Sequence, residues 1–222
     1  MPNLFSVETV FFTVLDYPVS FIEFFGTVFY FASVWLIARR NILTWPIGLA
    51  GVLLYMVLFY QYQLYSDSLE QIYYLAASAY GWWAWNRTKT SGKVDTAFSN
   101  RTTIASWAAV TLLLGLALGS VMTQIHLWLP AWFPIPASLP WLDAMTTVMS
   151  LSAMWLLTLR RTETWIYWII VDLAAIYVYF SKGIVFIGLQ YIILTFIAIY
   201  GLISWVTRQR KDETLGFFCD FK

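Results

Sequence analysis

Asp172 is the residue of this 222-residue sequence whose position most directly indicates chemistry. It lies at the middle of an apolar run, residues 165–180, where an ionised carboxylate costs several kcal/mol unless a partner or water reaches it. Lys182 follows ten residues later, about 15 Å along a helix, and is too distant to pair with it. The carboxylate therefore indicates a functional site; the alternative is a hydrogen bond to a Tyr, Thr or Gln of a neighbouring helix.

Aromatic and polar side chains share two helical faces in the sequence. Spacings of three and four residues place one set on the face of Asp172: Trp165, Trp168, Asp172, Ile176 and Tyr179. The same spacings link a set on an earlier run: Gln71, Tyr74, Ser78, Trp82 and Trp85. Gln190, in the last apolar run, adds a further amide. A surface that faces lipid has no need of these polar groups, so the two faces predict a central binding cavity.

The groups of this cavity define the ligand that it would accept. Indole and phenol rings stack on flat heteroaromatic rings and attract cations. Carboxylate and amide groups hydrogen-bond hydroxyls, and the charge of Asp172 favours a cation. A flat, positively charged ring bearing hydroxyls fits these groups. A phosphorylated ligand fits poorly, because the sequence places no Arg or Lys inside an apolar run to meet a phosphate.

The sequence contains no catalytic constellation. Its one histidine, His126, is expected in a loop, and there is no Cys/His cluster, glycine-rich phosphate loop or Ser/His pair. Thirteen basic residues against twelve acidic ones leave no basic stripe for a nucleic acid. We therefore expect neither an enzyme nor a metal or cofactor site, and no nucleic-acid partner.

The composition places most of the chain in a lipid bilayer. Hydrophobic residues make up 60% and charged residues 11% of the sequence, whereas about a quarter of the residues are charged in a soluble globular chain. No basic segment precedes an apolar run at the N-terminus, so we expect no cleavable signal peptide. Runs that suit a hydrocarbon layer of roughly 30 Å cover residues 20–38, 43–60, 69–85, 104–123, 141–159, 165–180 and 184–206.

The basic residues predict how these seven runs are oriented. Twelve of the thirteen fall on one side of the membrane, and only Lys182 falls on the other. The positive-inside rule makes the basic side cytoplasmic, with the N-terminus outside and the C-terminus inside. Six or eight runs would scatter the same charges over both sides.

The chain also contains an internal repeat. Residues 20–85 align without a gap on residues 140–205, at an offset of 120 positions, and roughly one position in five is identical. The identical pairs include Arg40/Arg160, Thr44/Thr164, Trp45/Trp165, Gly81/Gly201 and Trp85/Trp205. Parallel repeats of this kind are a transporter plan with the substrate near the midplane, although duplication also builds membrane receptors and scaffolds that transport nothing.

The repeat predicts the domain organisation of an all-α integral membrane protein. A first three-helix repeat covers residues 20–86, and a second covers residues 140–206. Each copy has an odd number of runs, so the linker helix 102–123 is needed for the second copy to start on the same side as the first. A cytoplasmic tail, residues 207–222, completes this 3+1+3 arrangement.

Several stretches resemble the PnuC-type vitamin transporters of bacteria. In the first half they are residues 41–48, NILTWPIG, and residues 80–85, YGWWAW. In the second half Trp165, Trp168 and Asp172 form the family's WxxWxxxD pattern, and residues 191–201 resemble its last helix. The resemblance covers about residues 15–206. It is interrupted at residues 184–187, IVFI, where a Leu-Tyr pair is common in the family.

The resemblance implies a fold, a substrate and partners. The fold would be that of a full-length relative of the SWEET transporters, assembled as a homotrimer in the bacterial inner membrane. The substrate would be nicotinamide riboside, moved by facilitated diffusion and trapped by a cytoplasmic kinase that phosphorylates it for NAD biosynthesis. Trp165 and Trp168 would flank its ring, while Asp172, Gln71 and Gln190 would bond its sugar. Thiamine, riboflavin and deoxynucleosides remain as alternative substrates.

Overall fold

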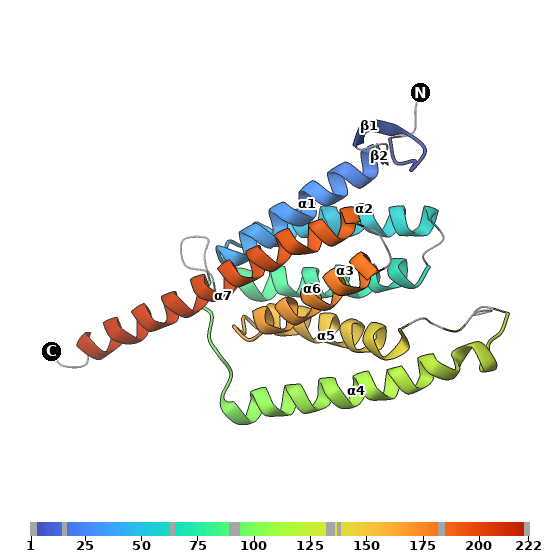
Figure 1. The fold of residues 1–222 in the computed structure, drawn as a ribbon. Helices are drawn as coiled ribbons and strands as arrows, with labels where there is room; N and C mark the ends of the chain where they lie inside the picture. Colours follow the sequence, from blue (N-terminus) through green and yellow to red (C-terminus); the bar gives the residue numbers. More distant parts are fainter. Residues whose placement is uncertain are drawn as a thin grey trace. The chain divides into compact units, whose positions relative to one another are not determined.

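The described residues form seven α-helices and one β-hairpin (Figure 1). The computed structural model describes residues 4–14, 17–62, 65–88, 94–131, 136, 139–181 and 185–219. The helices are α1 (Phe21–Ala38), α2 (Thr44–Gln61), α3 (Tyr65–Asn86), α4 (Arg101–Trp128), α5 (Pro140–Thr158), α6 (Thr164–Ser181) and α7 (Val185–Cys219). Each predicted run overlaps one of these helices, but α4 extends beyond the run 104–123 at both ends, so His126, expected in a loop, lies in the last turn of α4 instead. Lys182 and residues 220–222 of the predicted tail lie outside the described residues.

The helices identify a multi-pass membrane protein. Among the described residues, five segments are long and apolar enough to cross a bilayer: α1, α2, α4, α6 and residues 188–211 of α7. α3 and α5 do not meet that measure, because polar residues such as Glu70 and Asp143 lower their hydropathy. α7 continues to Cys219, so the end predicted for the last run at residue 206 was too early.

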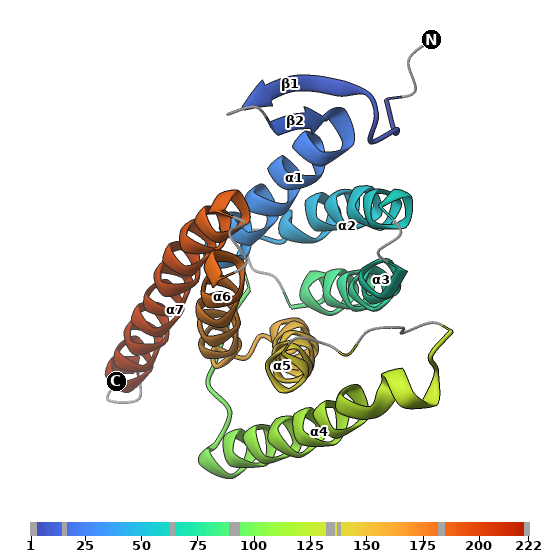
Figure 2. The ribbon, with the colours of Figure 1, turned by 45° about the vertical axis from the view of Figure 1, so that its right-hand side comes forward.

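The chain divides into two compact units. The first contains residues 1–95 together with 158–160, and so holds the hairpin and α1–α3. The second contains residues 96–157 together with 161–222, and holds α4–α7. Within the second unit α4 runs beside α5 (Figure 2), where Gly115 leaves room for the side chain of Met145.

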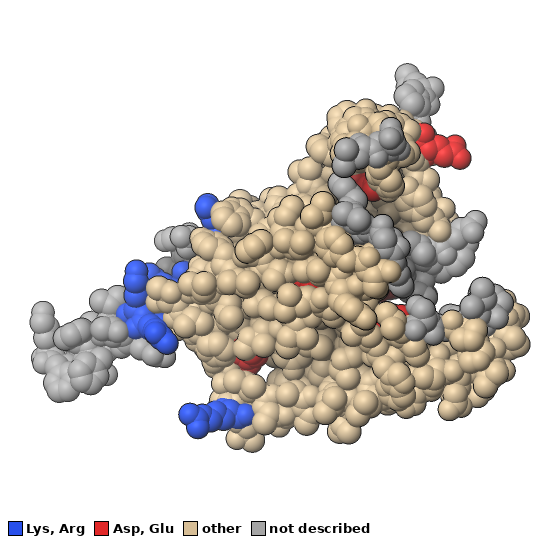
Figure 3. All heavy atoms as spheres, in the orientation of Figure 1, with Lys and Arg blue, Asp and Glu red and all other residues tan. Residues whose placement is uncertain are grey.

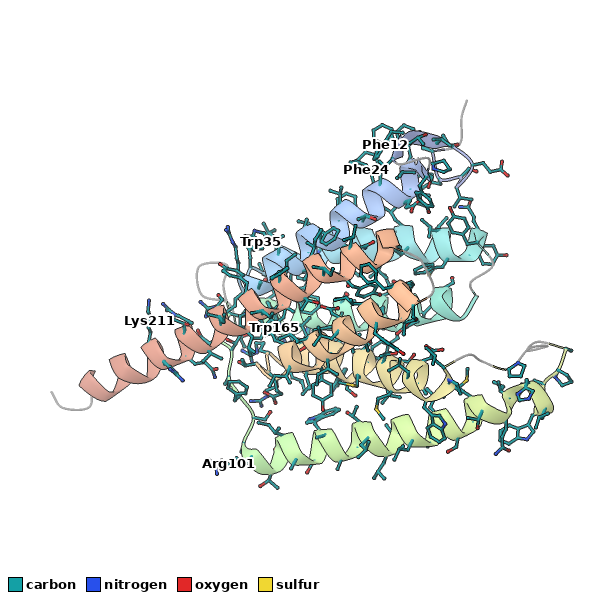
Figure 4. All side chains as sticks on the ribbon, viewed as in Figure 1. Phe12, Phe24, Trp35, Arg101, Trp165 and Lys211 are labelled. Carbon is teal, nitrogen blue, oxygen red and sulfur yellow. The ribbon has the colours of Figure 1, made fainter. Side chains whose placement is uncertain are left out.

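The hairpin that precedes α1 was not predicted from the sequence. Its strands, β1 (Val10–Val14) and β2 (Tyr17–Ser20), are antiparallel, and Phe11 and Phe12 of β1 pack on the ring of Phe24 (Figure 4). The Tyr17 hydroxyl donates a hydrogen bond of 2.9 Å to Glu23, and burial followed by this bond raises the pKa of Tyr17 above its usual value. The rings of Phe11 and Phe12 thus pack against the first turn of α1, which carries Phe24.

Helices α1 and α5 end in the same kind of turn. The second residue after the end of each helix is an arginine with positive φ, 57° at Arg40 and 60° at Arg160. The Asn41 amide then bonds the Leu36 carbonyl, and the Arg161 amide bonds the Leu156 carbonyl, each at 2.9 Å. A left-handed residue at this position closes the helix in a Schellman motif, and a cation there also suits the helix dipole.

Basic side chains gather at one end of the second unit. Figure 3 shows them where α4 begins and where α7 extends beyond the other helices, with an uncharged surface along the visible face of α4. The residues that the structure describes there are Arg101, Arg208, Arg210 and Lys211.

Candidate functional site

Helix α6 separates an exposed apolar face from a buried face. Ile166, Ile170, Leu173 and Tyr177 have exposed fractions of 43, 47, 53 and 64% and follow one another at helical spacing. On the opposite side Trp165 and Asp172 are 2% and 5% exposed. The remaining members of the predicted face, Trp168, Ile176 and Tyr179, are half-buried. The carboxylate of Asp172 thus points away from the surface that suits lipid.

Asp172 and Trp168 are both without a protein partner among the residues that the structure describes. Neither side chain forms a hydrogen bond there, Asp172 forms no ion pair, and the Trp168 indole contacts no other aromatic ring. A buried carboxylate without a partner carries a large desolvation cost, so it is a group that a ligand or water can stabilise. Two adjacent turns of α6 therefore offer one anionic group and one aromatic surface.

Trp165, predicted to flank the ligand ring, is packed differently from Trp168. Its ring meets that of Trp205 edge-on, with centroids 5.5 Å apart at 88°, and it lies against Gly201 in α7 (Figure 4). Its indole nitrogen is buried without a hydrogen-bond acceptor in the described part of the chain. The ring joins α6 to α7, which leaves the indole N–H as the polar group that it could offer to a ligand.

Two further predicted residues lie where α6 meets the start of α7. Tyr179 stacks on Tyr191, with ring centroids 5.5 Å apart and an interplanar angle of 14°. Gln190, next to Tyr191, is half-buried. The second unit therefore holds five of the predicted site residues on two consecutive helices: Trp165, Trp168, Asp172, Tyr179 and Gln190.

The other three predicted residues lie on α3, in the first unit. Gln71 and Ser78 are buried, with exposed fractions of 8% and 3%, and the Tyr74 hydroxyl donates to Glu70 at 2.9 Å. Trp82 was expected on their face, but it is 43% exposed. Gly81 takes that place instead, because the face must admit the ring of Trp45.

Comparison of the two halves of the repeat distinguishes residues that pack the helices from residues that could bind a ligand. Each predicted site residue has a counterpart 120 positions away in the other half. Seven of the eight differ from their counterparts, which are Gly48 for Trp168, Val52 for Asp172, Phe59 for Tyr179, Glu70 for Gln190, Tyr191 for Gln71, Leu194 for Tyr74 and Ala198 for Ser78. Only Trp165 is identical to its counterpart, Trp45, and the two make the same contacts with a Gly and a Trp. Shared residues therefore pack the helices, and the unshared residues are the candidates for binding.

Sequence reasoning missed a group of hydroxyls that joins three helices of the second unit. Thr111 of α4 lies 3.1 Å from the hydroxyl of Ser152 on α5 and 3.4 Å from that of Tyr167 on α6. Thr111 is buried. Its burial among apolar neighbours in α4 could have been anticipated from Gly115 one turn later, which marks the same close-packed face.

Comparison with known proteins identifies the family. The model of the family described as "Nicotinamide mononucleotide transporter" matches residues 20–207. The chain belongs to this transporter family. It is therefore a transporter by descent rather than an enzyme, as predicted, and the resemblance seen in the sequence is confirmed.

Two relatives in the nicotinamide mononucleotide transporter family show the range of named substrates. The nicotinamide riboside transporter PnuC of Escherichia coli K12 is 29% identical over 88% of this chain and 89% of its own length. The riboflavin/roseoflavin transporter RibM of Streptomyces davaonensis is 28% identical, with 91% and 92% covered. The family is thus one of vitamin transporters with more than one substrate.

A crystal structure described as that of the vitamin B3 transporter PnuC has the same fold. Its TM-score is 0.59, its sequence identity is 23%, and the match covers 84% of this chain and 80% of the other. Because the sequence identity is low, this similarity supports the helical fold alone.

Proposed function

We propose that this chain is a uniporter that moves nicotinamide riboside across the bacterial inner membrane by facilitated diffusion. The observation that carries the proposal is Asp172, a buried carboxylate with no partner among the described residues, one turn from a Trp168 indole that contacts no other ring. An anion and an aromatic surface one helical turn apart match a positively charged pyridinium ring joined to a sugar.

The remaining groups have separate roles in this proposal. Trp168 stacks on the pyridinium ring, and Asp172 and Gln190 hydrogen-bond the ribose hydroxyls. Trp165 holds the α6–α7 contact and can contribute its indole N–H. Tyr179 lines the same face of α6. Gln71, Tyr74 and Ser78 supply the polar groups of the first three-helix repeat.

The choice of a riboside over a mononucleotide rests on charge. The family description names the mononucleotide, but a phosphate needs Arg or Lys donors. In the described part of the chain the basic side chains lie in the end turns of helices, beyond them, or in the extension of α7 past residue 207. A carboxylate in the middle of α6 would repel a phosphate. An uncharged or cationic vitamin avoids both difficulties.

The membrane arrangement in this proposal has seven spans in parallel 3+1+3 repeats, like a full-length SWEET transporter. The N-terminus is outside and the basic C-terminus is cytoplasmic. The repeats rock about the site to alternate access, and the absence of a buried chain of ionisable groups in the sequence favours uniport. A homotrimer and a cytoplasmic kinase that traps the product for NAD biosynthesis complete the proposal, both by resemblance to the family.

Riboflavin is the second candidate substrate, because the relative from Streptomyces davaonensis carries that name. Thiamine is a further cationic heteroaromatic vitamin. Calorimetric titration of the purified protein with each of the three, followed by uptake into liposomes, tests the proposal. Tight binding and uptake of nicotinamide riboside support it. Tight binding of riboflavin or thiamine alone would replace the substrate, and binding without uptake would indicate a receptor.

A further inference from the structure

The residues between α3 and α4 pair with the turn that leads into α6. In the second unit Ala97 forms a parallel β-bridge with Arg161, and the Thr162 amide donates to the Ala97 carbonyl at 3.0 Å. Two residues further on, the Ser99 amide donates to a carboxylate oxygen of Glu163 at 3.2 Å. We call residues 96–99 the α4 leader. It is bonded to two consecutive residues directly before the first residue of α6.

Glu163 links the α4 leader to α6, because it bonds the leader with its side chain and the helix with its backbone. Its backbone carbonyl accepts the Ile166 amide at 3.0 Å, so it stands at the N-terminus of the helix. A negative side chain there also interacts favourably with the helix dipole. Thr162 and Thr164 on either side bond Gln209 of α7 and the Ala153 carbonyl of α5, at 3.2 and 2.7 Å. All three residues are almost fully buried, with exposed fractions of 0, 2 and 0%.

Among the described residues of the first repeat, no β-bridge or carboxylate bond of this kind is formed at the equivalent turn. The counterpart of Glu163 is Leu43, which is 54% exposed. The hydroxyls of the following residues, Thr44 and Thr164, nevertheless donate to backbone carbonyls at equivalent positions, those of Ser33 and Ala153. A buried carboxylate that replaces an exposed leucine is therefore an addition to the shared scaffold. It occurs at the start of the helix that carries Trp168 and Asp172.

We propose that Glu163 is a positioning residue, which fixes the N-terminal end of α6 to the α4 leader and thereby sets the orientation of the substrate-binding face. This inference rests on the proposed function of α6. The bond is kept throughout the transport cycle, because its partners in the α5–α6 turn, Thr162 and Glu163, are almost fully buried even though Ala97 is exposed. Glu163 itself touches no substrate.

Three substitutions test the role of the carboxylate. Glu163→Leu, which installs the residue of the first repeat, removes the acceptor and should raise the KM for nicotinamide riboside about tenfold or more, with a smaller change in maximal rate. Glu163→Gln keeps an acceptor oxygen for the Ser99 amide and should remain within about threefold of the wild-type KM. Leu43→Ala, at the matched exposed position, should leave the KM unchanged. Glu163→Leu with a wild-type KM, or Glu163→Gln as impaired as Glu163→Leu, overturns the proposal.

A disulfide provides a second test that does not depend on the carboxylate. Neighbouring strands lie about 4.8 Å apart, within the Cα separation that a disulfide can span. Ala97→Cys with Arg161→Cys, in a Cys219→Ser background that removes the one native cysteine, should crosslink the bridge. The crosslink should leave transport intact in the otherwise wild-type chain and restore the KM of Glu163→Leu. Loss of transport on crosslinking, reversed by reductant, would show that the bridge must open and would overturn the proposal.

Hydrogen exchange separates failure of this inference from failure of the proposed function. Amides of the α4 leader should lose protection in Glu163→Leu and keep it in Glu163→Gln, whichever vitamin is carried. If Glu163→Leu does not fold, Ser99→Pro removes the N–H donor from the other side of the bond and should give the same rise in KM. If the wild-type protein takes up none of the three vitamins, the proposed function fails, and unchanged leader protection in Glu163→Leu would overturn the positioning role independently.

Discussion

The Trp165 indole occupies the space that a side chain at Gly201 would need. A Cβ built on Gly201 would lie 2.5 Å from Cζ2 of Trp165, closer than real Cβ atoms approach. Trp45 and Gly81 have the same relationship in the other unit. In each copy the glycine therefore allows the third helix to approach the tryptophan of the second, and a further tryptophan, Trp85 or Trp205, closes the contact edge-on.

This relationship predicts the effect of an added methyl group. Gly201→Ala should destabilise the protein by about 1–3 kcal/mol, because the large ring of Trp165 is held on its other side by Trp205 and cannot move away freely. Thermal unfolding of the detergent-solubilised protein measures the change. Gly26→Ala is the matched control, since a Cβ there would be 3.6 Å from its nearest neighbour. Equal stability of the two variants would contradict the close packing.

The hydroxyls that fasten the second helix of each repeat predict unequal effects. Thr44 Oγ1 donates to the Ser33 carbonyl at 2.8 Å, and Thr164 Oγ1 donates to the Ala153 carbonyl at 2.7 Å. Thr164→Val should cost about 1 kcal/mol, the net value of one hydrogen bond. Thr44→Val should cost more, because the buried Ser33 hydroxyl also lies 3.1 Å from the hydroxyl that is removed. Denaturation of the two variants side by side checks this order, and the reverse order would contradict it.

Trp168 and the packing tryptophan Trp45 should respond differently to truncation. Trp168→Ala should weaken the binding of nicotinamide riboside by about 10- to 100-fold, a loss of about 1–3 kcal/mol of stacking energy, with a small change in thermal stability because its indole is half-buried. Trp45→Ala, in the packing position of the first repeat, should instead lower stability by about 3–5 kcal/mol. Calorimetric titration and thermal unfolding of both variants separate the roles. A Trp168→Ala variant that binds normally would remove this ring from the site.

The helices were accessible from the sequence because their causes are local. Apolar run length predicts a helix in lipid, and the identity of Trp45 with Trp165 reflects a packing contact made twice. The periodicity of α6 likewise anticipated that Asp172 faces away from the exposed stripe of Ile170 and Leu173. The run lengths and the periodicity of α6 depend on residues within a few helical turns of one another.

The features that the sequence did not predict depend on contacts between distant segments. The hairpin at residues 10–20 is stabilised by rings of α1, and the pairing of Ala97 with Arg161 joins residues 64 positions apart. Periodicity carries no information about such pairings. An indole on a polar stripe, such as that of Trp165, fits either ligand stacking or helix packing. Its identity with Trp45 was visible in the sequence and was the signal that favoured packing.

Asp172 provides the sharpest test of the site, because its effects on stability and on binding should have opposite signs. The carboxylate is buried without a partner among the described residues, so Asp172→Asn should leave the unfolding temperature unchanged or raise it. The same substitution removes the negative charge and should weaken binding of the cationic nicotinamide riboside by about tenfold or more. Binding of uncharged riboflavin, if the protein accepts it, should change much less. Asp143→Asn, in the first turn of α5, is the control and should change the affinity for neither ligand. Unchanged affinity of Asp172→Asn for nicotinamide riboside would exclude this carboxylate from the site, whereas lost affinity accompanied by a lower unfolding temperature would show that it has a protein partner.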